Sequence, residues 1–247
     1  MAAPGTQTQP LPDGRALEYQ SLMSMATRPP EHAASPPATV AFVDIAGFSA
    51  IADVYGDASA IAVLDLFEAM VRDALSDYEP PIKWIGDEAM LAFPAPETAI
   101  EALGKLLPAC RSEARLPLVR AGVNHGPVVR RGSDLFGTTV NVAARITSIA
   151  APGQLIATRP VADAASASGI LVRDLGMTAL RSVAGEMPLY AIELAPAADP
   201  SWIDPVCKMH APYAPYRRAP DEGPWFCSER CETAYHKSPA TYRPAGL

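Results

Sequence analysis

Short apolar runs alternate with longer amphipathic stretches through the middle of this chain. The runs have the length of strands and lie at 39–45, 82–85, 89–93, 118–124, 128–130, 154–157 and 189–194. The amphipathic stretches have the length of helices and lie at 57–78, 97–110 and 139–149. The first of these stretches has an apolar face made by Ile61, Leu64, Val71 and Leu75. This order predicts an α+β domain with a mostly antiparallel sheet and helices on one face.

Two turn signals predict which strands pair. Gly86-Asp87 separates the runs at 82–85 and 89–93, as in a hairpin. His125-Gly126-Pro127 separates 118–124 from 128–130 and predicts a second hairpin.

Pro- and Ala-rich segments flank this region on both sides. Residues 1–37 are predicted to be disordered, with a short helix over 15–25. Residues 196–203 have the composition of a linker. The predicted organisation is a disordered N-terminus, a domain over 38–195 and a small unit over 204–247.

Charge and hydropathy exclude some classes of partner. The 247 residues carry a formal net charge of −7, which argues against nonspecific binding to nucleic acid or to an anionic membrane surface. No apolar run in the sequence approaches the roughly 18 residues of a bilayer-spanning helix. The first residues, MAAPGTQTQPLPDG, lack the basic and apolar regions of a secretory signal. The sequence therefore predicts a cytoplasmic protein without nucleic-acid or membrane partners.

An acidic residue interrupts the first apolar run. Asp44 lies between Val43 and Ile45, where a buried carboxylate is costly unless a positive group meets it. Asp87 lies in the hairpin turn, and because neighbouring strands are about 4.8 Å apart, the two carboxylates can converge. Carboxylates this close repel each other, and Mg²⁺, which prefers hard oxygen ligands, relieves the repulsion. Asp87 also fits a plain turn residue, since Gly-Asp is common in turns.

A polar pair interrupts the apolar pattern of the stretch at 139–149. Asn141 and Arg145 are four residues apart and share one helix face. Together they can bind a ribose oxygen and a phosphate, since Arg donates in a fixed fork. The alternative is an ordinary solvated helix face.

Five motifs, taken together, resemble the class III nucleotide cyclases. They occur in the family's order between Ala38 and Leu194 and read AFVDIAGFSAI, IKWIGDEAMLAF, VRAGVNHGPVV, DLFGTTVNVAARI and ALRSVAGEMPLYAIEL. The resemblance implies the ferredoxin-like fold of these cyclases. It also implies their reaction, in which the ribose 3′-oxygen of a nucleoside triphosphate attacks its own α-phosphorus and expels pyrophosphate.

The resemblance assigns the metal-binding and catalytic residues. Asp44 and Asp87 match the two metal-binding aspartates, and Ile45 matches the residue whose backbone carbonyl binds one ion. Asn141 matches the residue that orients the ribose, and Arg145 matches the residue that stabilises charge on the transferring phosphate. Two Mg²⁺ or Mn²⁺ ions per active site are implied.

The resemblance also assigns the substrate-binding residues. Lys83 matches the base-reading lysine and Asp134 its aspartate partner. Lys83 can donate to adenine N1 and Asp134 can accept from N6, whereas guanine reverses this pattern. ATP is therefore the predicted substrate and cyclic AMP the product. Phe48 and Arg181 complete the substrate-binding set, and Arg181 stands where the family usually has a phosphate-binding lysine.

A homodimer is the assembly that the resemblance implies. Each active site of the family is composite, with metal aspartates from one subunit and base-reading, Asn and Arg groups from the other. The few residues between Arg130 and Asp134 predict a reduced dimerisation arm. Two alternatives stay open: a guanylate cyclase, and a catalytically silent cyclase-like module that senses nucleotide or metal.

Three cysteines lie near the C-terminus. Cys207, Cys227 and Cys231 belong to a segment that resembles the small YHS domains through DPVCKM and FCSERC. So short a unit has little core, and a metal would help it fold. Three thiolates with His210 or His236 as fourth ligand would suit Zn²⁺ or another soft metal.

The thiols also have a plainer interpretation. They can be reduced cysteines packed around Trp225 and Phe226. The fourth cysteine, Cys110, stands alone in a predicted helix and is interpreted as a packing residue.

Overall fold

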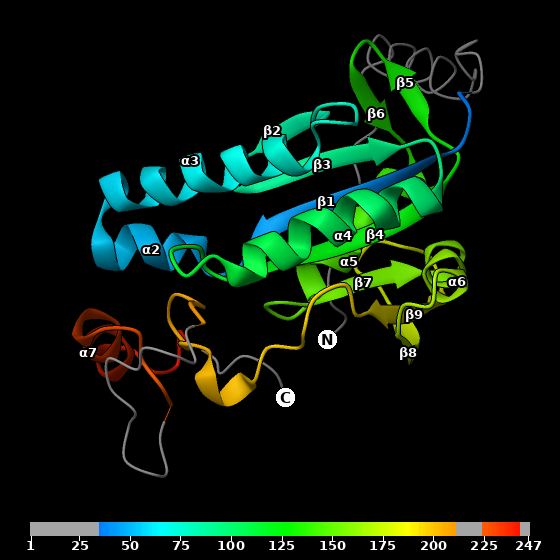
Figure 1. The fold of residues 1–247 in the computed structure, drawn as a ribbon. Coiled ribbons are helices and arrows are strands. Elements are labelled where there is room, and N and C mark those ends of the chain that lie inside the picture. Colours follow the sequence, from blue (N-terminus) through cyan, green and yellow to red (C-terminus); the bar gives the residue numbers. More distant parts are fainter. Residues whose placement is uncertain (1–34, 211–223, 243–247) are drawn as a thin grey trace, which may run out of the picture. The chain divides into compact units, whose positions relative to one another are not determined.

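The computed structural model describes residues 35–210 and 224–242 (Figure 1). The predicted helix over 15–25 and nearly all of the predicted disordered segment lie outside these residues. The described residues belong to one compact unit that begins at Ser35. In chain order the elements are β1 (Ala38–Ile45), α2 (Phe48–Tyr55), α3 (Asp57–Ala74), β2 (Lys83–Ile85), β3 (Glu88–Phe93), α4 (Pro96–Ser112), β4 (Val119–Gly126), β5 (Val129–Arg131), β6 (Asp134–Phe136), α5 (Thr138–Ile149), β7 (Leu155–Thr158), α6 (Arg159–Ala167), β8 (Val172–Ala179), β9 (Glu186–Ile192), the 3-10 turn Pro200–Trp202 and α7 (Glu229–Lys237).

A seven-stranded sheet forms the centre of this unit. Its strand order is β2-β3-β1-β4-β7-β9-β8, so the first strand of the chain lies near the middle (Figure 1). Every pairing in the sheet is antiparallel except that of β4 with β7. The mostly antiparallel α+β fold predicted from the sequence is confirmed.

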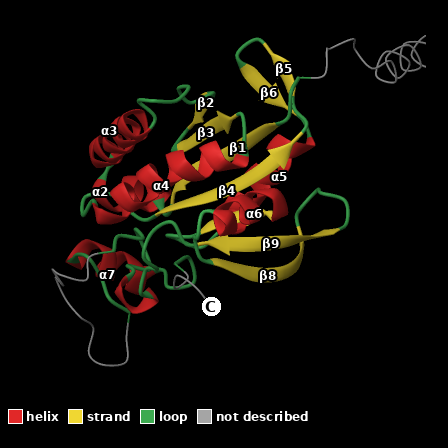
Figure 2. Cartoon of the chain, turned by 45° about the vertical axis from the view of Figure 1, so that its right-hand side comes forward, coloured by secondary structure: helices red, strands yellow, loops and turns green. Residues whose placement is uncertain are grey.

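Helices cover both faces of the sheet. Successive residues of a strand face opposite sides, so Val43 and Ile45 of β1 pack with α3, α4 and α6 in one core. Val40 and Phe42 face the other side and pack in a cluster with Ala143 of α5 (Figure 2). The expectation of helices on one face is therefore wrong. The parallel pair β4–β7 needs a crossover connection, and α5 supplies it on the second face.

The predicted pairing of the short strand at 128–130 is also wrong. β5 pairs with β6 in a separate two-stranded hairpin, in which Arg130 lies opposite Leu135. β4 continues to Gly126 and uses its edge to pair with β1 along its whole length. Pro127 follows, and because proline lacks an N–H it favours an exit from the sheet. The hairpin predicted around Gly86-Asp87 is present as β2 and β3.

The first helical stretch differs from its prediction. The chain forms α2 before it, and α3 ends at Ala74, before the predicted end. Ala60, Phe67 and Val71 are buried, whereas Ile61 is 58% exposed. The buried face is thus centred on Phe67, which contacts the Trp84 ring edge-on. None of the described helices is long and apolar enough to cross a membrane.

A close approach joins α5 to the middle of the sheet. Gly122 of β4 lies directly under α5, and a β-carbon at this position would come within 2.3 Å of the Thr147 backbone nitrogen. The Thr147 hydroxyl donates to the Ala143 carbonyl one turn earlier, at 3.0 Å. Glycine is therefore required here for spacing and not for its backbone angles.

Candidate active site

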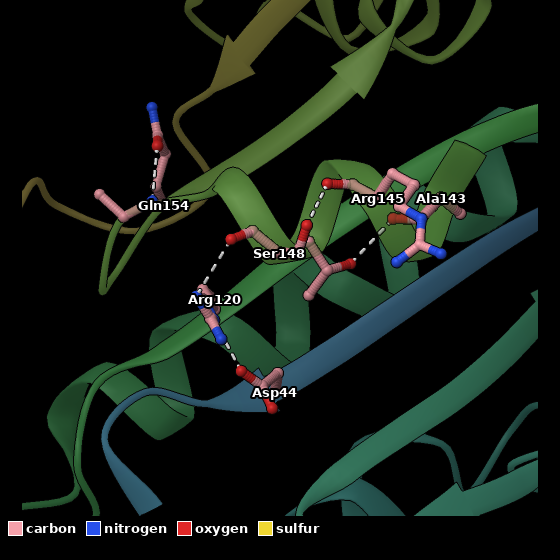
Figure 3. A network of polar contacts seen from close by, with 8 residues as sticks. Asp44, Arg120, Ala143, Arg145, Ser148 and Gln154 are labelled. Atoms are coloured by element: carbon pink, nitrogen blue, oxygen red, sulfur yellow. Dashed lines mark hydrogen bonds and ion pairs between the residues drawn. The ribbon is translucent and has the colours of Figure 1, made fainter. Parts of the chain in front are cut away.

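Asp44 lies near the end of β1 between two charged residues on neighbouring strands. In the sheet register, Glu88 of β3 is on one side and Arg120 of β4 on the other. Arg120 Nε donates to Asp44 Oδ2 at 2.6 Å (Figure 3). This charge-assisted contact supplies a positive partner for the buried carboxylate of Asp44. Arg120, a cationic residue in the otherwise mostly apolar strand β4, was not predicted from the sequence as this partner.

Asp87 lies in the turn between β2 and β3, beside Asp44. Burial and the charge of Asp44 raise the pKa of Asp87 to about 6, and a hydrogen bond between the two carboxyl groups adds to this shift. The structure therefore brings the two carboxyl groups together. Two oxygen ligands at one point, with surplus negative charge, fit a divalent cation such as Mg²⁺ or Mn²⁺.

Glu88 is a third acid at this point and was not expected there. Burial and then the charge of Asp44 raise the pKa of Glu88 from 4.5 to about 7, and Arg120 partly opposes this shift. Glu88 lies beside the predicted metal-binding acids, so it adds to the negative potential that a cation would neutralise.

The raised pKa of Glu88 predicts a pH-dependent stability. Because the folded pKa lies above the ordinary value, Glu88 contributes stability below about pH 4.5 that is lost as pH rises through about 7. In metal-free buffer we therefore expect the free energy of unfolding to fall more steeply between about pH 5 and 8 in the wild type than in Glu88→Gln. Urea unfolding of both proteins at a series of pH values measures this difference.

Two further samples complete the measurement. Glu101→Gln removes an exposed carboxylate of α4 and should leave the wild-type slope unchanged. Excess Mg²⁺ should stabilise the wild type more at pH 8 than at pH 5, since the acids must lose their protons to bind it. Equal slopes in the wild type and Glu88→Gln would contradict the assignment.

A second polar pair joins the main sheet to the β5–β6 hairpin. Lys83 Nζ of β2 donates to Asp134 Oδ2 of β6 at 2.7 Å. The Leu135 N–H donates to Asp134 Oδ1 at 2.8 Å, and the Lys83 contact holds the pKa of Asp134 below its usual range. The two side chains are 37% and 29% exposed, so a ligand can reach both of them.

Asn141 and Arg145 lie on α5, and both are exposed. The Ser148 hydroxyl donates to the Arg145 carbonyl at 2.7 Å. Arg120 Nη1 donates in turn to the Ser148 carbonyl at 3.5 Å, so Arg120 lies between Asp44 and the C-terminal end of α5 (Figure 3). The helix that carries Asn141 and Arg145 is thereby connected to the acidic cluster.

The other predicted residues occupy separate places. Ile45 is buried, and its N–H donates to the Asp87 carbonyl at 3.4 Å. Phe48 begins α2, is half-buried and contacts the apolar cores on both sides of that helix. Arg181 is exposed in the turn between β8 and β9, where no described contact connects it to the acidic cluster.

The three C-terminal cysteines also converge. Cys207, Cys227 and Cys231 lie together with Asp204, a residue that the sequence analysis did not include. The two predicted histidine ligands do not join them. His210 contacts the Arg111 guanidinium, with its Nε2 3.0 Å from Nη2. His236 packs instead against the rings of Phe226 and Tyr235. The histidine ligand is therefore a wrong prediction.

A family model matches the part of the chain that contains Asp44, Lys83 and Arg145, and two curated relatives match the chain in part. The model of the adenylate and guanylate cyclase catalytic domain matches residues 31–194. The pH-sensitive adenylate cyclase MT1302 of Mycobacterium tuberculosis (strain CDC 1551 / Oshkosh) is 33% identical over 161 residues, which are 62% of this chain and 40% of that protein. An adenylate cyclase of Streptomyces griseus is 33% identical over 112 residues, 45% of this chain and 28% of that protein. The matches span less than half of each relative's length.

Solved structures show the same fold. Adenylate cyclase from Trypanosoma brucei in its monomeric state superposes with a TM-score of 0.60 at 22% identity, over 67% of this chain and 91% of that one. The adenylyl cyclase CyaB of P. aeruginosa gives 0.55 at 20% identity, over 63% and 93%. The guanylate cyclase domain of RhGC from Catenaria anguillulae, in complex with GTP, gives 0.54 at 20% identity, over 64% and 96%. At these identities the likeness concerns the fold.

Proposed function

This chain belongs to the family of adenylate and guanylate cyclase catalytic domains, and we propose that it converts ATP to 3′,5′-cyclic AMP and pyrophosphate. The convergence of Asp44 and Asp87 carries this proposal. Two partly buried carboxyl groups that repel each other are costly unless metal ions bind them. Their presence therefore favours a two-metal enzyme over a catalytically silent relative.

Asp44 and Asp87 would hold two Mg²⁺ or Mn²⁺ ions, with the backbone carbonyl of Ile45 as a further ligand. The bound ions would activate the ribose 3′-oxygen and neutralise charge on the α-phosphate and the pyrophosphate. Arg120 orients the Asp44 carboxylate before an ion arrives. The negative charge of Glu88 beside them favours capture of a divalent cation over a monovalent one.

Lys83 and Asp134 would bind the base. Their 2.7 Å contact places a donor and an acceptor side by side, as the N1 acceptor and N6 donor of adenine require. Guanine presents the reverse pattern and would leave both groups without partners, which supports ATP over GTP. A guanylate cyclase is the second candidate, because members of the matched family include it.

Asn141 and Arg145 would act on the nucleotide bound by a partner subunit. Asn141 would orient the ribose and Arg145 would stabilise charge on the transferring phosphate. Both lie exposed on α5, as groups that complete a site across a two-fold interface must. Arg181 would bind phosphate, and Phe48 would contact the substrate beside the metal aspartates. The enzyme would therefore work as a homodimer with two equivalent composite sites.

Mixing two inactive variants tests both the chemistry and the assembly. Asp44→Asn lacks a metal ligand and Arg145→Ala lacks the phosphate-stabilising charge, so each homodimer should be nearly inactive. A mixed dimer has one site with both defects and one with neither. If subunits exchange freely, half of the dimers are mixed and have one working site of two, so an equal mixture should recover about a quarter of wild-type activity. Cyclic AMP measured by mass spectrometry gives the result.

Two outcomes would count against parts of the proposal. No recovery by the mixture, with the wild type active, would mean that each site is built within one chain. An inactive wild type with both ATP and GTP, in Mg²⁺ and in Mn²⁺, would favour the silent nucleotide- or metal-sensing module.

A further inference from the structure

The C-terminal segment contains a compact set of metal ligands outside the cyclase site. One ligand atom each from Asp204, Cys207, Cys227 and Cys231 lies within 4.8 Å of all the others. Asp204, Cys207 and Cys231 are buried, and Cys227 is half-buried. Burying a carboxylate among three thiols is costly unless a cation joins them.

The sulfur distances fit a tetrahedral cation and not a disulfide. Cys207 Sγ lies 3.4 Å from Cys227 Sγ, which lies 3.7 Å from Cys231 Sγ. A tetrahedral site with Zn–S bonds of about 2.3 Å separates its sulfur ligands by about 3.8 Å. A disulfide needs about 2.05 Å, and all of these cysteines are free.

Backbone hydrogen bonds orient the ligands. Asp204 Oδ1 accepts from the N–H groups of Val206 and Cys207, and Oδ2 accepts from that of Cys227. The Ser228 side chain caps α7 through the Cys231 N–H, which places Cys227 and Cys231 on either side of the helix start. Such second contacts are typical of residues held in place for a metal.

The catalytic region itself contributes a group to this cluster. The hydroxyl of Tyr55, the last residue of α2, lies 3.3 Å from Cys227 Sγ and 3.2 Å from Cys231 Sγ, and it also contacts the Ser228 hydroxyl. A thiolate has no proton to donate, so the Tyr55 hydroxyl can only act as the donor in these contacts when the cysteines are ionised. The Arg230 guanidinium lies 5.8 Å from the Tyr55 ring centroid and adds positive charge beside the cluster.

The other side of the cluster contacts the turn that follows β1. A β-carbon on Gly47 would lie 3.2 Å from the carbonyl carbon and oxygen of Cys207, so this peptide packs against the Gly47 backbone. The Lys208 carbonyl accepts from the Leu118 N–H at 3.1 Å, and the Leu118 carbonyl accepts from the Ala46 N–H at 2.9 Å. Ala46 comes two residues after Asp44.

We propose that Asp204, Cys207, Cys227 and Cys231 bind one thiophilic divalent cation of the Zn²⁺ class, and that this cation holds both ends of the segment from Ala46 to Tyr55. The coupling to activity rests on the proposed cyclase function. α2 is eight residues long, about 12 Å, and runs from the turn after Asp44 to the thiols. Loading the thiol site orders this helix and with it the turn that presents Asp44 and Ile45.

Zinc titration of the full-length protein tests the site. After chelator treatment under reducing conditions, we expect one Zn²⁺ to bind per chain, measured against a chromophoric chelator, and bound Co²⁺ to show thiolate charge-transfer absorption. Cys207→Ser and Cys231→Ser should each weaken Zn²⁺ binding about 100-fold or more. Cys110→Ala, which removes the thiol outside the cluster, and Asp44→Asn should bind Zn²⁺ as the wild type does. Equal binding by all these variants, or a mass lower by two hydrogen atoms because a disulfide has formed, would overturn the assignment.

Two readouts test the coupling. Amide hydrogen exchange in α2 should slow when one equivalent of Zn²⁺ is added, and Tyr55→Phe should keep the stoichiometry but reduce this protection. In excess Mg²⁺, the zinc-loaded protein should form cyclic AMP about fivefold or more faster than the stripped protein. Equal rates in an active enzyme would overturn the coupling. An inactive protein that still binds zinc and protects α2 would refute the cyclase proposal alone.

Discussion

Asp44→Asn should lower the rate of cyclic AMP formation about 1,000-fold or more. The substitution keeps the size of the side chain but removes the charge at the point where Asp87 and Glu88 also converge. An amide oxygen is a weaker ligand for Mg²⁺ than a carboxylate. The variant also removes the carboxylate that Arg120 Nε contacts at 2.6 Å. The unpaired guanidinium charge would then compete with the metal ions for the same space.

The measurement must separate lost chemistry from lost folding. The rate is compared with the folded fraction from thermal unfolding, since the ion pair with Arg120 also contributes to stability. Asp65→Asn, which removes an exposed carboxylate of α3, is the matched control and should keep full activity. Activity within tenfold of the wild type for folded Asp44→Asn would refute the two-metal assignment.

Exchanging the proposed base-binding pair, Lys83 and Asp134, should produce the second largest effect. In Lys83→Glu combined with Asp134→Ser, an acid and a small hydroxyl replace the donor and acceptor that now lie 2.7 Å apart. Hydrogen-bonding sites reject a base whose groups they cannot pair, so we expect the ratio of kcat/KM for ATP to that for GTP to fall about 1,000-fold or more. Both products are quantified by mass spectrometry.

A second ion pair provides the control for this exchange. Lys105 Nζ donates to Asp77 Oδ2 at 3.0 Å on the exposed surface. Lys105→Glu combined with Asp77→Ser changes the same charges and should leave the ATP to GTP ratio unchanged. The single variants show whether Lys83 and Asp134 act together. A double variant that loses activity with ATP but keeps its preference over GTP would argue that other residues select the base.

The sequence was most informative where local pattern and motif agree. The strand before Asp44, the hairpin around Gly86-Asp87 and the helix that carries Arg145 could all be predicted, because apolar periodicity and turn residues define them. α6 and β8 were not predicted. α6 is rich in small residues, and β8 is largely exposed with an irregularity at Gly176, so neither has a clear apolar pattern.

Partners across the sheet could not be predicted in the same way. The burial of Asp44 required a positive group, but the choice of Arg120 depends on the register of β1 with β4, which a single strand does not specify. Asp204 was missed for a similar reason. It lies three residues from Cys207, and a turn brings its carboxylate to the thiols, whereas His210 falls beside Arg111.

The close contact at Gly122 limits which substitutions this fold can accept. Gly122 has no side chain, and the missing methyl group sets the height of α5 above the sheet. A larger residue would lift the helix, and a displacement of about 1 Å in a reacting group can cost about 100-fold in rate. Residue 122 thus determines the distance between α5 and the sheet. In a search for improved variants it should tolerate as little as Arg145 does, for reasons of distance alone.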